Sequence, residues 1–327
     1  MLTVPQTASA EALSDGGPLN GRLPGFVARA TQQDMAARIE QAIEERAVFI
    51  AESGTGTGKT LAYLVPAILS GKKILISTGT KALQDQLFQR DLPMIRDALG
   101  VPVTTALLKG RANYLCLHRL ERAEIETRFG NSVRSDNLRK IREWAGRTPS
   151  GDTSELADVP EDVDVWPQVT STPENCLGST CEHFSRCFVN KARREALAAE
   201  ILVVNHHLFF ADLVLREEGF GQLLPGVEAV IFDEAHQLPE IASNFFGSTV
   251  SSQQLLGLSR DSITEEHKEH SGVEGLEAAA RRLDKSVADL RLALGVEPRR
   301  GAWGKIEQHK PFQGAMDTLR AALTQLS

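Results

Sequence analysis

The stretch ESGTGTGKT, residues 52–60, constrains the fold more than any other part of this 327-residue chain. An apolar run that predicts a strand, AVFIAES, leads into it, and a run that predicts a helix, LAYLVPAIL, follows it. A glycine-rich loop between a strand and a helix can curl so that its backbone N–H groups point at phosphate oxygens. A flexible Gly/Thr turn without a ligand is the alternative, but such a turn does not require the lysine and threonine. The stretch therefore predicts a phosphate-binding loop in an α/β fold.

The residues of this loop have distinct expected roles in binding a nucleoside triphosphate. Lys59 reaches the β- and γ-phosphates, and the hydroxyl of Thr60 is a ligand for Mg²⁺. Ser53 stands where the strict pattern has glycine, and a small residue is tolerable there. The predicted nucleotide-binding residues of the loop are Ser53, Gly54, Thr55, Gly56, Thr57, Gly58, Lys59 and Thr60.

A second acidic site follows another apolar run, in AVIFDEAH, residues 229–236. Asp233 and Glu234 come at the exit of this predicted strand, the edge where α/β proteins place their chemistry. Asp233 can hold Mg²⁺ through water, while Glu234 can orient and deprotonate the water that attacks the γ-phosphate. Alone, such a pair is more often a solvated loop. Beside a phosphate-binding loop, it predicts nucleoside triphosphate hydrolysis.

Short apolar runs alternate with helical patterns along much of the chain. KKILIST, ILVVNHH and AVIFDEAH predict strands, and their alternation with helices predicts a parallel sheet of βαβ units. The sheet domain is predicted to cover residues 25–108 and 200–250, split by an insert over residues 109–199. The first 24 residues are rich in Gly, Pro, Ser and Ala and predict a flexible tail.

The last part of the chain, residues 251–327, has a helical pattern. Five apolar residues fall on one helix face at steps of seven, four, three and four: Leu276, Leu283, Val287, Leu290 and Leu294. No stretch of the chain approaches the ~20 apolar residues of a membrane span, so no membrane is expected. The formal charge of −7 gives no global sign of nucleic-acid binding. Residues 109–147 are nevertheless basic, which fits either a path for a nucleic-acid strand or a solvated helix face.

The four cysteines of the chain predict a metal site rather than disulfides. Cys176, Cys181 and Cys187 lie within a dozen residues, and Cys116 lies far upstream. The N-terminus has no secretory pattern, so we expect a reducing compartment, where clustered cysteines more often bind metal than form bridges. Spacing alone leaves a structural zinc ion and an iron–sulfur cluster open. The insert has few aliphatic stretches, so we expect metal ligation to supply much of its folding energy.

The motifs also carry a resemblance to a known family. DEAH, the phosphate-binding loop and ISTGTKALQDQL between them resemble the first, RecA-like motor domain of superfamily 2 helicases. The four cysteines, with LLKGRANYLC, STPENCLGSTC, VVNHHLF and VIFDEAHQLP, resemble the XPD/DinG-type iron–sulfur DNA helicases, in particular their bacterial YoaA/DinG-like branch. The resemblance runs from about residue 25 to the end of the chain. After about residue 250 it rests on helical texture similar to the arch domain of the family.

This resemblance implies an ATP-dependent, 5′→3′ DNA helicase that acts on single-stranded or forked DNA in replication or repair. It implies ATP, Mg²⁺ and a [4Fe–4S] cluster as cofactors, and a cytoplasmic, nucleoid-associated location in a bacterium. The four cysteines would hold the cluster, and Gln32 would read the adenine. Thr78, Thr80 and Gln84 would touch the DNA backbone. The implied catalytic residues are Lys59, Thr60, Asp233, Glu234 and His236.

Two other classes of function remain open on the sequence alone. One is an ATPase or kinase with a zinc-stabilised insert, and the other is a DNA-binding fragment without catalysis. The family's second motor domain has no counterpart here, so we expect the chain not to unwind DNA by itself. His206 and His207 are adjacent on a predicted strand and would point to opposite faces, so we expect a structural role rather than a shared metal.

Overall fold

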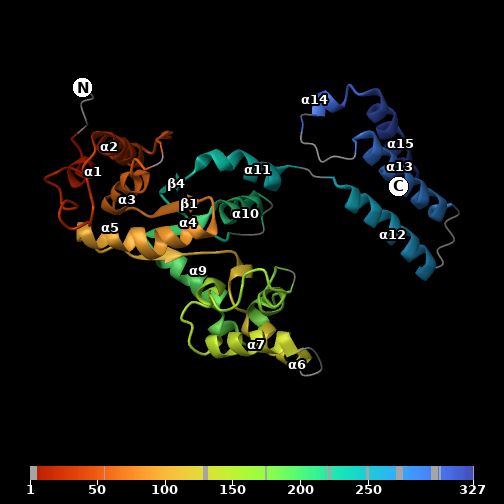
Figure 1. The fold of residues 1–327 in the computed structure, drawn as a ribbon, viewed down its shortest axis with the longest axis horizontal. Helices are drawn as coiled ribbons and strands as arrows, with labels where there is room; N and C mark the ends of the chain where they lie inside the picture. Colours follow the sequence, from red (N-terminus) through yellow and green to blue (C-terminus); the bar gives the residue numbers. More distant parts are fainter. Residues whose placement is uncertain are drawn as a thin grey trace. The chain divides into compact units, whose positions relative to one another are not determined.

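The computed structural model describes residues 6–54, 56–127, 132–173, 175–217, 219, 222–247, 250–269, 275–295, 301 and 303–326 (Figure 1). The chain divides into two compact units, Met1–Phe246 and Gly247–Ser327. The sequence placed this division a few residues later, after residue 250. Thr55, one of the predicted nucleotide-binding residues, lies outside the described residues.

The first unit contains a four-stranded sheet in which every pairing is parallel, as the sequence predicts. The strand order is β2-β3-β1-β4, with β1 Ile74–Thr78 and β3 Ile201–Asn205 at the centre. β2 Thr105–Leu107 and β4 Ala229–Phe232 form the edges. Because parallel strands end at one edge of a sheet, the loops after β1, β3 and β4 lie near one another.

Both faces of the sheet are covered, because alternate strand residues point to opposite sides. Ile74, Ile76 and Val203 pack against one apolar cluster together with the N-terminal helices. Those helices are α1 Ala8–Ala12, α2 Ala30–Glu45, α3 Lys59–Leu69 and α5 Leu92–Leu99. Leu75 and Val204 pack on the other side with α9 Phe188–Ala198 and α10 His206–Glu217. The two central strands therefore form a rigid base for the loops at their ends.

The prediction of a flexible tail over residues 1–24 is wrong for the part that the structure describes. Leu13 and Leu19 are completely buried in the core beside α2 and α3. Two hydrogen bonds attach this segment to α2, from Ser9 N to Glu40 Oε2 at 2.8 Å and from Gln33 Nε2 to Leu13 O at 3.0 Å. The composition suggested disorder, but the widely spaced leucines bury enough apolar surface to fix the segment.

The prediction of a strand at AVFIAES is also wrong. Residues 47–54 have no strand assignment, and Val48 and Ile50 are 93% and 89% exposed. In β4, a strand at the edge of the sheet, Val230 is 38% exposed. The sequence reports only how apolar the run is, whereas a strand also needs a neighbour that pairs with its backbone.

The insert is built from short helices and turns around an apolar core of its own. Its helices are α6 Leu117–Thr127, α7 Ser132–Ala145 and α8 Trp166–Val169. The core includes Leu115, Ile141 and two tryptophans, Trp144 and Trp166, which meet edge to face at 6.4 Å. This part of the insert therefore has more apolar packing than its few aliphatic stretches indicate. The loop with three cysteines follows it and contains only two 3₁₀ turns, η4 Gly178–Thr180 and η5 Phe184–Arg186.

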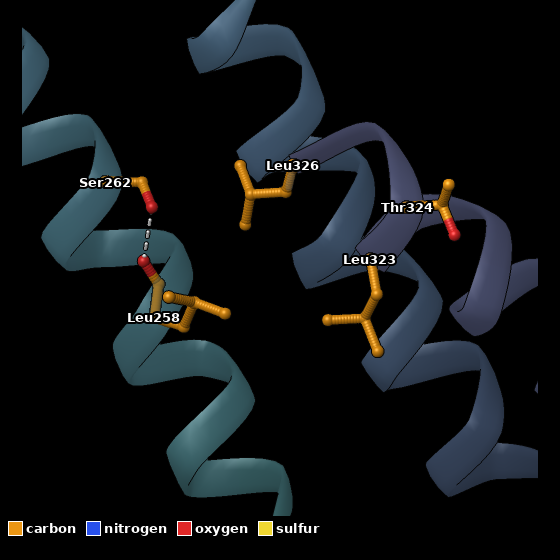
Figure 2. Close-up of a pocket in the computed structure, with 5 residues that line it drawn as sticks. All are labelled: Leu258, Ser262, Leu323, Thr324 and Leu326. Atoms are coloured by element: carbon orange, nitrogen blue, oxygen red, sulfur yellow. Dashed lines mark hydrogen bonds between the residues drawn. The ribbon is translucent and has the colours of Figure 1, made fainter.

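The second unit is helical, as predicted, and contains α12 Ser252–Glu269, α13 Leu276–Ala293, α14 Trp303–Ile306 and α15 Lys310–Leu326. Leu283 and Val287 of the predicted stripe are buried in its core, and Leu290 packs against them. α12 and α15 both contact α13 and leave a pocket lined by Leu258, Ser262, Leu323, Thr324 and Leu326 (Figure 2). No helix in the described part of the chain is both long and apolar enough to cross a bilayer.

Candidate functional site

The predicted phosphate-binding loop is folded as a compact turn ahead of α3. Gly56 and Gly58 have φ angles of 76° and 85°, in the left-handed region that favours glycine. The hydroxyl of Thr57 contacts that of Ser53 and donates to Gly54 O at 2.8 Å. α3 begins at Lys59, so the first free N–H groups of the helix face the loop.

The turn after β4 lies directly against this loop, although more than 170 residues separate the two in sequence. Lys59 Nζ lies 3.4 Å from Glu234 Oε1, and each side chain is 30% exposed. The Tyr63 hydroxyl donates to Asp233 Oδ2 at 3.3 Å. The structure therefore brings together the two motifs that the sequence predicted to act together.

Tyr63 is a member of this site that sequence reasoning missed. It lies one helical turn after Lys59, is 4% exposed, and its oxygen is hydrogen-bonded to Thr60 as well as to Asp233. Burial, helped by the nearby Asp233 charge, raises its pKa well above the usual range, so it stays a neutral donor. Thr60 and Asp233, the two predicted Mg²⁺ ligands, thus flank one buried hydroxyl. The only signal in the sequence that could have identified Tyr63 is its spacing of one helical turn from Lys59.

The acidic turn has unusual backbone geometry. Glu234 has φ 54° and ψ 42°, a left-handed conformation that costs a non-glycine residue on the order of 1–3 kcal/mol. Glu234 N donates to Asp233 Oδ1 at 3.1 Å, and His236 Nδ1 lies 3.3 Å from Glu234 Oε2. His236 is therefore beside the site and touches it through Glu234, with its side chain 72% exposed.

The electrostatics of the turn favour a cation. Burial raises the pKa of Asp233, and the neighbouring Glu234 charge raises it further. The Tyr63 hydrogen bond and the Lys59 charge oppose this shift only in part. Two carboxylates in a partly buried position repel each other, and a divalent cation between them and the phosphates would relieve that repulsion.

Gln32 and Arg29 approach the phosphate-binding loop from the start of α2. Gln32 is 4% exposed and donates through Nε2 to Gly58 O at 2.9 Å, which excludes an ordinary helix-surface role. A Cβ added to Gly58 would lie 2.1 Å from this Nε2 and displace the Gln32 amide, and the φ of 85° also favours glycine there. Arg29, which sequence reasoning missed, donates to Gly56 O. Both side chains support the loop backbone.

The predicted DNA-contact residues are placed differently from the expectation. Thr78 is 1% exposed, and Gln84 is fully buried with its amide donating to Leu108 O and Val203 O. Thr80 is exposed and caps α4 Lys81–Gln86 by accepting from Leu83 N at 3.2 Å. Of the three side chains, the structure leaves only Thr80 accessible to a DNA backbone.

The start of the basic stretch is likewise not a phosphate-binding surface. Lys109 is buried, and its Nζ lies 2.7 Å from both Asp85 Oδ1 and Asp152 Oδ2. Farther along, Arg142 pairs with Glu124, and Arg119 donates to Gln168 O. Lys109 therefore joins the sheet to the insert. The interpretation of residues 109–147 as a path for a nucleic-acid strand is wrong at this residue.

Cys116 lies near the three clustered cysteines, and all four are free thiols. Burial raises the pKa of Cys116, and Cys187, Cys181 and Cys176 are close enough to raise it further by their charge. Gly178 N lies 3.4 Å from Cys176 Sγ, and an Arg119 N–H is directed at Cys116. Four soft ligands with N–H donors beside them suit an iron–sulfur cluster or a zinc ion.

A Glu/His group borders the cysteine loop. Glu121, Glu182 and His183 form the one set of three or more potential ligand side chains in the described residues whose ligand atoms all lie within 4.8 Å of one another. His183 Nε2 lies 3.0 Å from Glu121 Oε2, and Arg186 approaches Nδ1 at 3.1 Å. Both ring nitrogens are engaged, so His183 ties the loop of Cys181 to α6, the helix after Cys116.

Comparison with known proteins finds related helicases. Residues 30–135 match the family model for the DEAD/DEAH box helicase. The chain is 45% identical over 319 residues to the ATP-dependent DNA helicase YoaA of Haemophilus influenzae, and 49% identical over 286 residues to that of Escherichia coli. It is 32% identical over 289 residues to the ATP-dependent helicase DinG of Mycobacterium tuberculosis. The chain is related to the YoaA and DinG helicases.

The matches cover most of this chain but only about half of each relative. They cover 97%, 87% and 82% of this chain but 50%, 45% and 42% of the three relatives. The chain thus spans about half the length of the YoaA and DinG relatives it matches. Asp233–His236 lie outside the family-model match at residues 30–135, so their assignment rests on the geometry above.

Proposed function

We propose that this chain carries the ATP-binding motor domain of an ATP-dependent DNA helicase. The observation that carries the proposal is the 3.4 Å approach of Lys59 Nζ to Glu234 Oε1, which joins the phosphate-binding loop and the acidic turn in one site. The YoaA and DinG relatives are named as ATP-dependent helicases, which supports the same class of activity.

The residues have separate tasks in this proposal. Lys59 and the N–H groups at the start of α3 bind the phosphates. Lys59 then leaves its pairing with Glu234. Thr60 and Asp233 hold Mg²⁺, which neutralises phosphate charge. Glu234, released from Lys59, orients the attacking water and accepts its proton. Gln32 holds the loop backbone and reads the adenine, and His236 contacts Glu234.

We also propose that Cys116, Cys176, Cys181 and Cys187 hold a [4Fe–4S] cluster. The proximity of Cys116 to the other three cysteines supports a four-thiolate site. The resemblance of the cysteine-bearing segments to those of the XPD/DinG-type helicases favours iron–sulfur over zinc.

The substrate proposed for the longer protein is single-stranded or forked DNA, with 5′→3′ translocation in replication or repair in the bacterial cytoplasm. A second sheet domain, which would supply the arginine that stabilises the transferring phosphoryl group, does not occur among the described residues. We therefore propose that the chain alone binds ATP, hydrolyses it slowly and does not unwind DNA.

ATP binding and hydrolysis by the purified chain test this proposal. Lys59→Ala should abolish hydrolysis and weaken ATP binding, while Glu234→Gln should keep ATP bound and abolish hydrolysis. Arg38→Ala on the exposed face of α2 is the control and should match the wild type. Equal hydrolysis by all four proteins would contradict the assignment of the site.

A further inference from the structure

His206 is a buried histidine that the proposed chemistry does not use. It is the first residue of α10 rather than part of a strand, and it is completely buried, while its neighbour His207 is exposed. Its Nδ1 lies 2.7 Å from Ser77 Oγ, and its Nε2 lies 2.9 Å from Asp233 O. It therefore connects the ends of the three strands β1, β3 and β4.

The partners of the ring determine where its proton lies. A backbone carbonyl only accepts hydrogen bonds, so Nε2 carries the proton and donates to Asp233 O. Nδ1 then accepts from the Ser77 hydroxyl. Both nitrogens are satisfied inside the protein, so His206 has no free nitrogen for a metal ion. The sequence-based expectation of a structural role holds, but the opposite-face argument for it does not.

These contacts close a ring of hydrogen bonds around the acidic turn. Ser77 Oγ donates to His206, His206 donates to Asp233 O, and Asp233 N donates back to Ser77 O at 2.9 Å. Both the N–H and the C=O of Asp233 are thereby fixed against the central strands. The peptide that contains Asp233 O also contains the nitrogen of Glu234, so this peptide sets the φ of Glu234.

We propose that His206 is a positioning residue for the carboxylates of Asp233 and Glu234. By holding the peptide between them, it keeps Glu234 in the left-handed conformation with φ 54°, from which its carboxylate reaches Lys59. It also keeps Asp233 facing the Tyr63 hydroxyl, which Thr60 contacts as well. Without this hydrogen bond, the peptide rotates and relieves the strain at Glu234, and the Mg²⁺ ligand Asp233 moves with it.

The proposal rests on the proposed nucleotide site and predicts a specific defect. Residues that orient metal ligands typically contribute about 10- to 100-fold to metal affinity. His206 should therefore matter for the Mg²⁺-dependent part of nucleotide binding. It should not matter for phosphate contacts that the loop makes without Mg²⁺, because those come from the start of α3.

The test measures the affinity of a fluorescent ATP analogue for the chain in Mg²⁺ and in EDTA. The ratio of the two affinities is the readout. A glutamine amide nitrogen reaches about as far as Nε2, so His206→Gln can still donate to Asp233 O. An asparagine amide reaches only about as far as Nδ1, so His206→Asn keeps Ser77 and loses Asp233. His207→Gln is the matched control on the adjacent, exposed residue.

We expect His206→Asn to lower the ratio by about tenfold or more, with the affinity in EDTA unchanged. His206→Gln and His207→Gln should stay close to the wild-type ratio. A wild-type ratio in a folded His206→Asn protein would overturn the proposal. If thermal unfolding shows that His206→Asn does not fold, Ser77→Ala replaces it. Loss of the ring's anchor should then lower the ratio, and an unchanged ratio would overturn the proposal.

Failure of the underlying function gives a different result. If the wild type and His207→Gln bind the nucleotide equally in Mg²⁺ and EDTA, or not at all, the nucleotide site itself is wrong and the role of His206 falls with it. If the wild type shows the Mg²⁺ effect and His206→Asn shows it equally, only the positioning role is wrong.

Discussion

The sheet and the cysteine loop of the insert are stabilised in opposite ways. All five residues of β1 are buried between two layers of helices, and the turn after β4 carries the acidic residues of the proposed nucleotide site. The loop of Cys176, Cys181 and Cys187 contains two 3₁₀ turns, and Cys176 is exposed. Apolar packing can hold the first without a ligand, whereas the second has ligand atoms in place of a core. With the proposed cluster, one compact unit would combine a sheet held by apolar packing with a loop held by its ligand.

A charged junction adds to the apolar contacts between the two regions, where Phe188 packs against both the sheet cluster and the insert core. Lys109 follows β2 and pairs with Asp85 of α4 and with Asp152 of the insert. Its backbone N–H donates to the Tyr114 hydroxyl at 3.0 Å, and its Nζ reaches Ser154 Oγ at 3.2 Å. α4 begins at Lys81, directly after the loop of Thr78 and Thr80. The junction therefore connects the insert to the helix behind the predicted DNA-contact loop.

The largest expected effect comes from replacing one cysteine, which should change the cysteine loop and leave the sheet unchanged. Cys181→Ser should lose all bound iron, because three thiolates and a hydroxyl do not hold the cluster. The loop over residues 170–187 should then exchange its amide hydrogens faster, while β1 and β3 keep their protection. Hydrogen exchange with mass spectrometry and iron analysis measure both. Iron at the wild-type level, or loss of protection in the sheet, would contradict the comparison.

The next effect breaks the junction. Lys109→Met leaves Asp85 and Asp152 without their shared cation and should lower the free energy of unfolding by about 3–5 kcal/mol. Urea unfolding followed by tryptophan fluorescence is suitable, because Trp144 and Trp166 lie in the core of the insert. Arg38→Met, which breaks the exposed pair with Asp34, is the control and should cost below about 0.5 kcal/mol. Equal costs would mean that the buried pairs add nothing.

A smaller effect concerns the sheet alone and compares the cost in stability of truncating a buried and a partly exposed side chain. Ile76→Val removes one methylene from a completely buried position in β1 and should cost about 0.5–1.5 kcal/mol. Val230→Ala on β4 should cost less per carbon removed, because that side chain is 38% exposed. Neither change should alter the iron content. A loss of iron in Ile76→Val would show that the cluster depends on sheet packing.

The smallest effect concerns pH at the point where the chain re-enters the sheet. Hydrogen bonds from the Thr104 N–H, and then from its hydroxyl, hold the pKa of Glu200 below its usual value. A depressed pKa stabilises the fold above the unfolded-state pKa, and this contribution is lost as pH falls through the folded-state value. It should be below about 1 kcal/mol because the hydrogen bonds to Glu200 are exposed to solvent. Unfolding of the wild type and Glu200→Gln should converge at acid pH; a constant difference would contradict this.

The sequence predicted the parts of the fold and site that depend on local pattern. The strands at residues 74–78, 201–205 and 229–232 and the loop before α3 were predicted correctly. The failures depend on partners distant in sequence. Val48 and Ile50 are apolar but unpaired, Leu13 is buried by α2, and Lys109 is neutralised by Asp85 and Asp152. Composition cannot report such partners.

Metal and sulfide analysis of the chain, purified without oxygen, tests the central claim most directly. The account predicts about four iron atoms and four acid-labile sulfides per chain, with visible absorbance that disappears in Cys116→Ser. One zinc ion per chain without sulfide would replace the cluster with a structural zinc site. Neither metal in a folded chain would contradict the claim that the cysteine loop is held by a ligand.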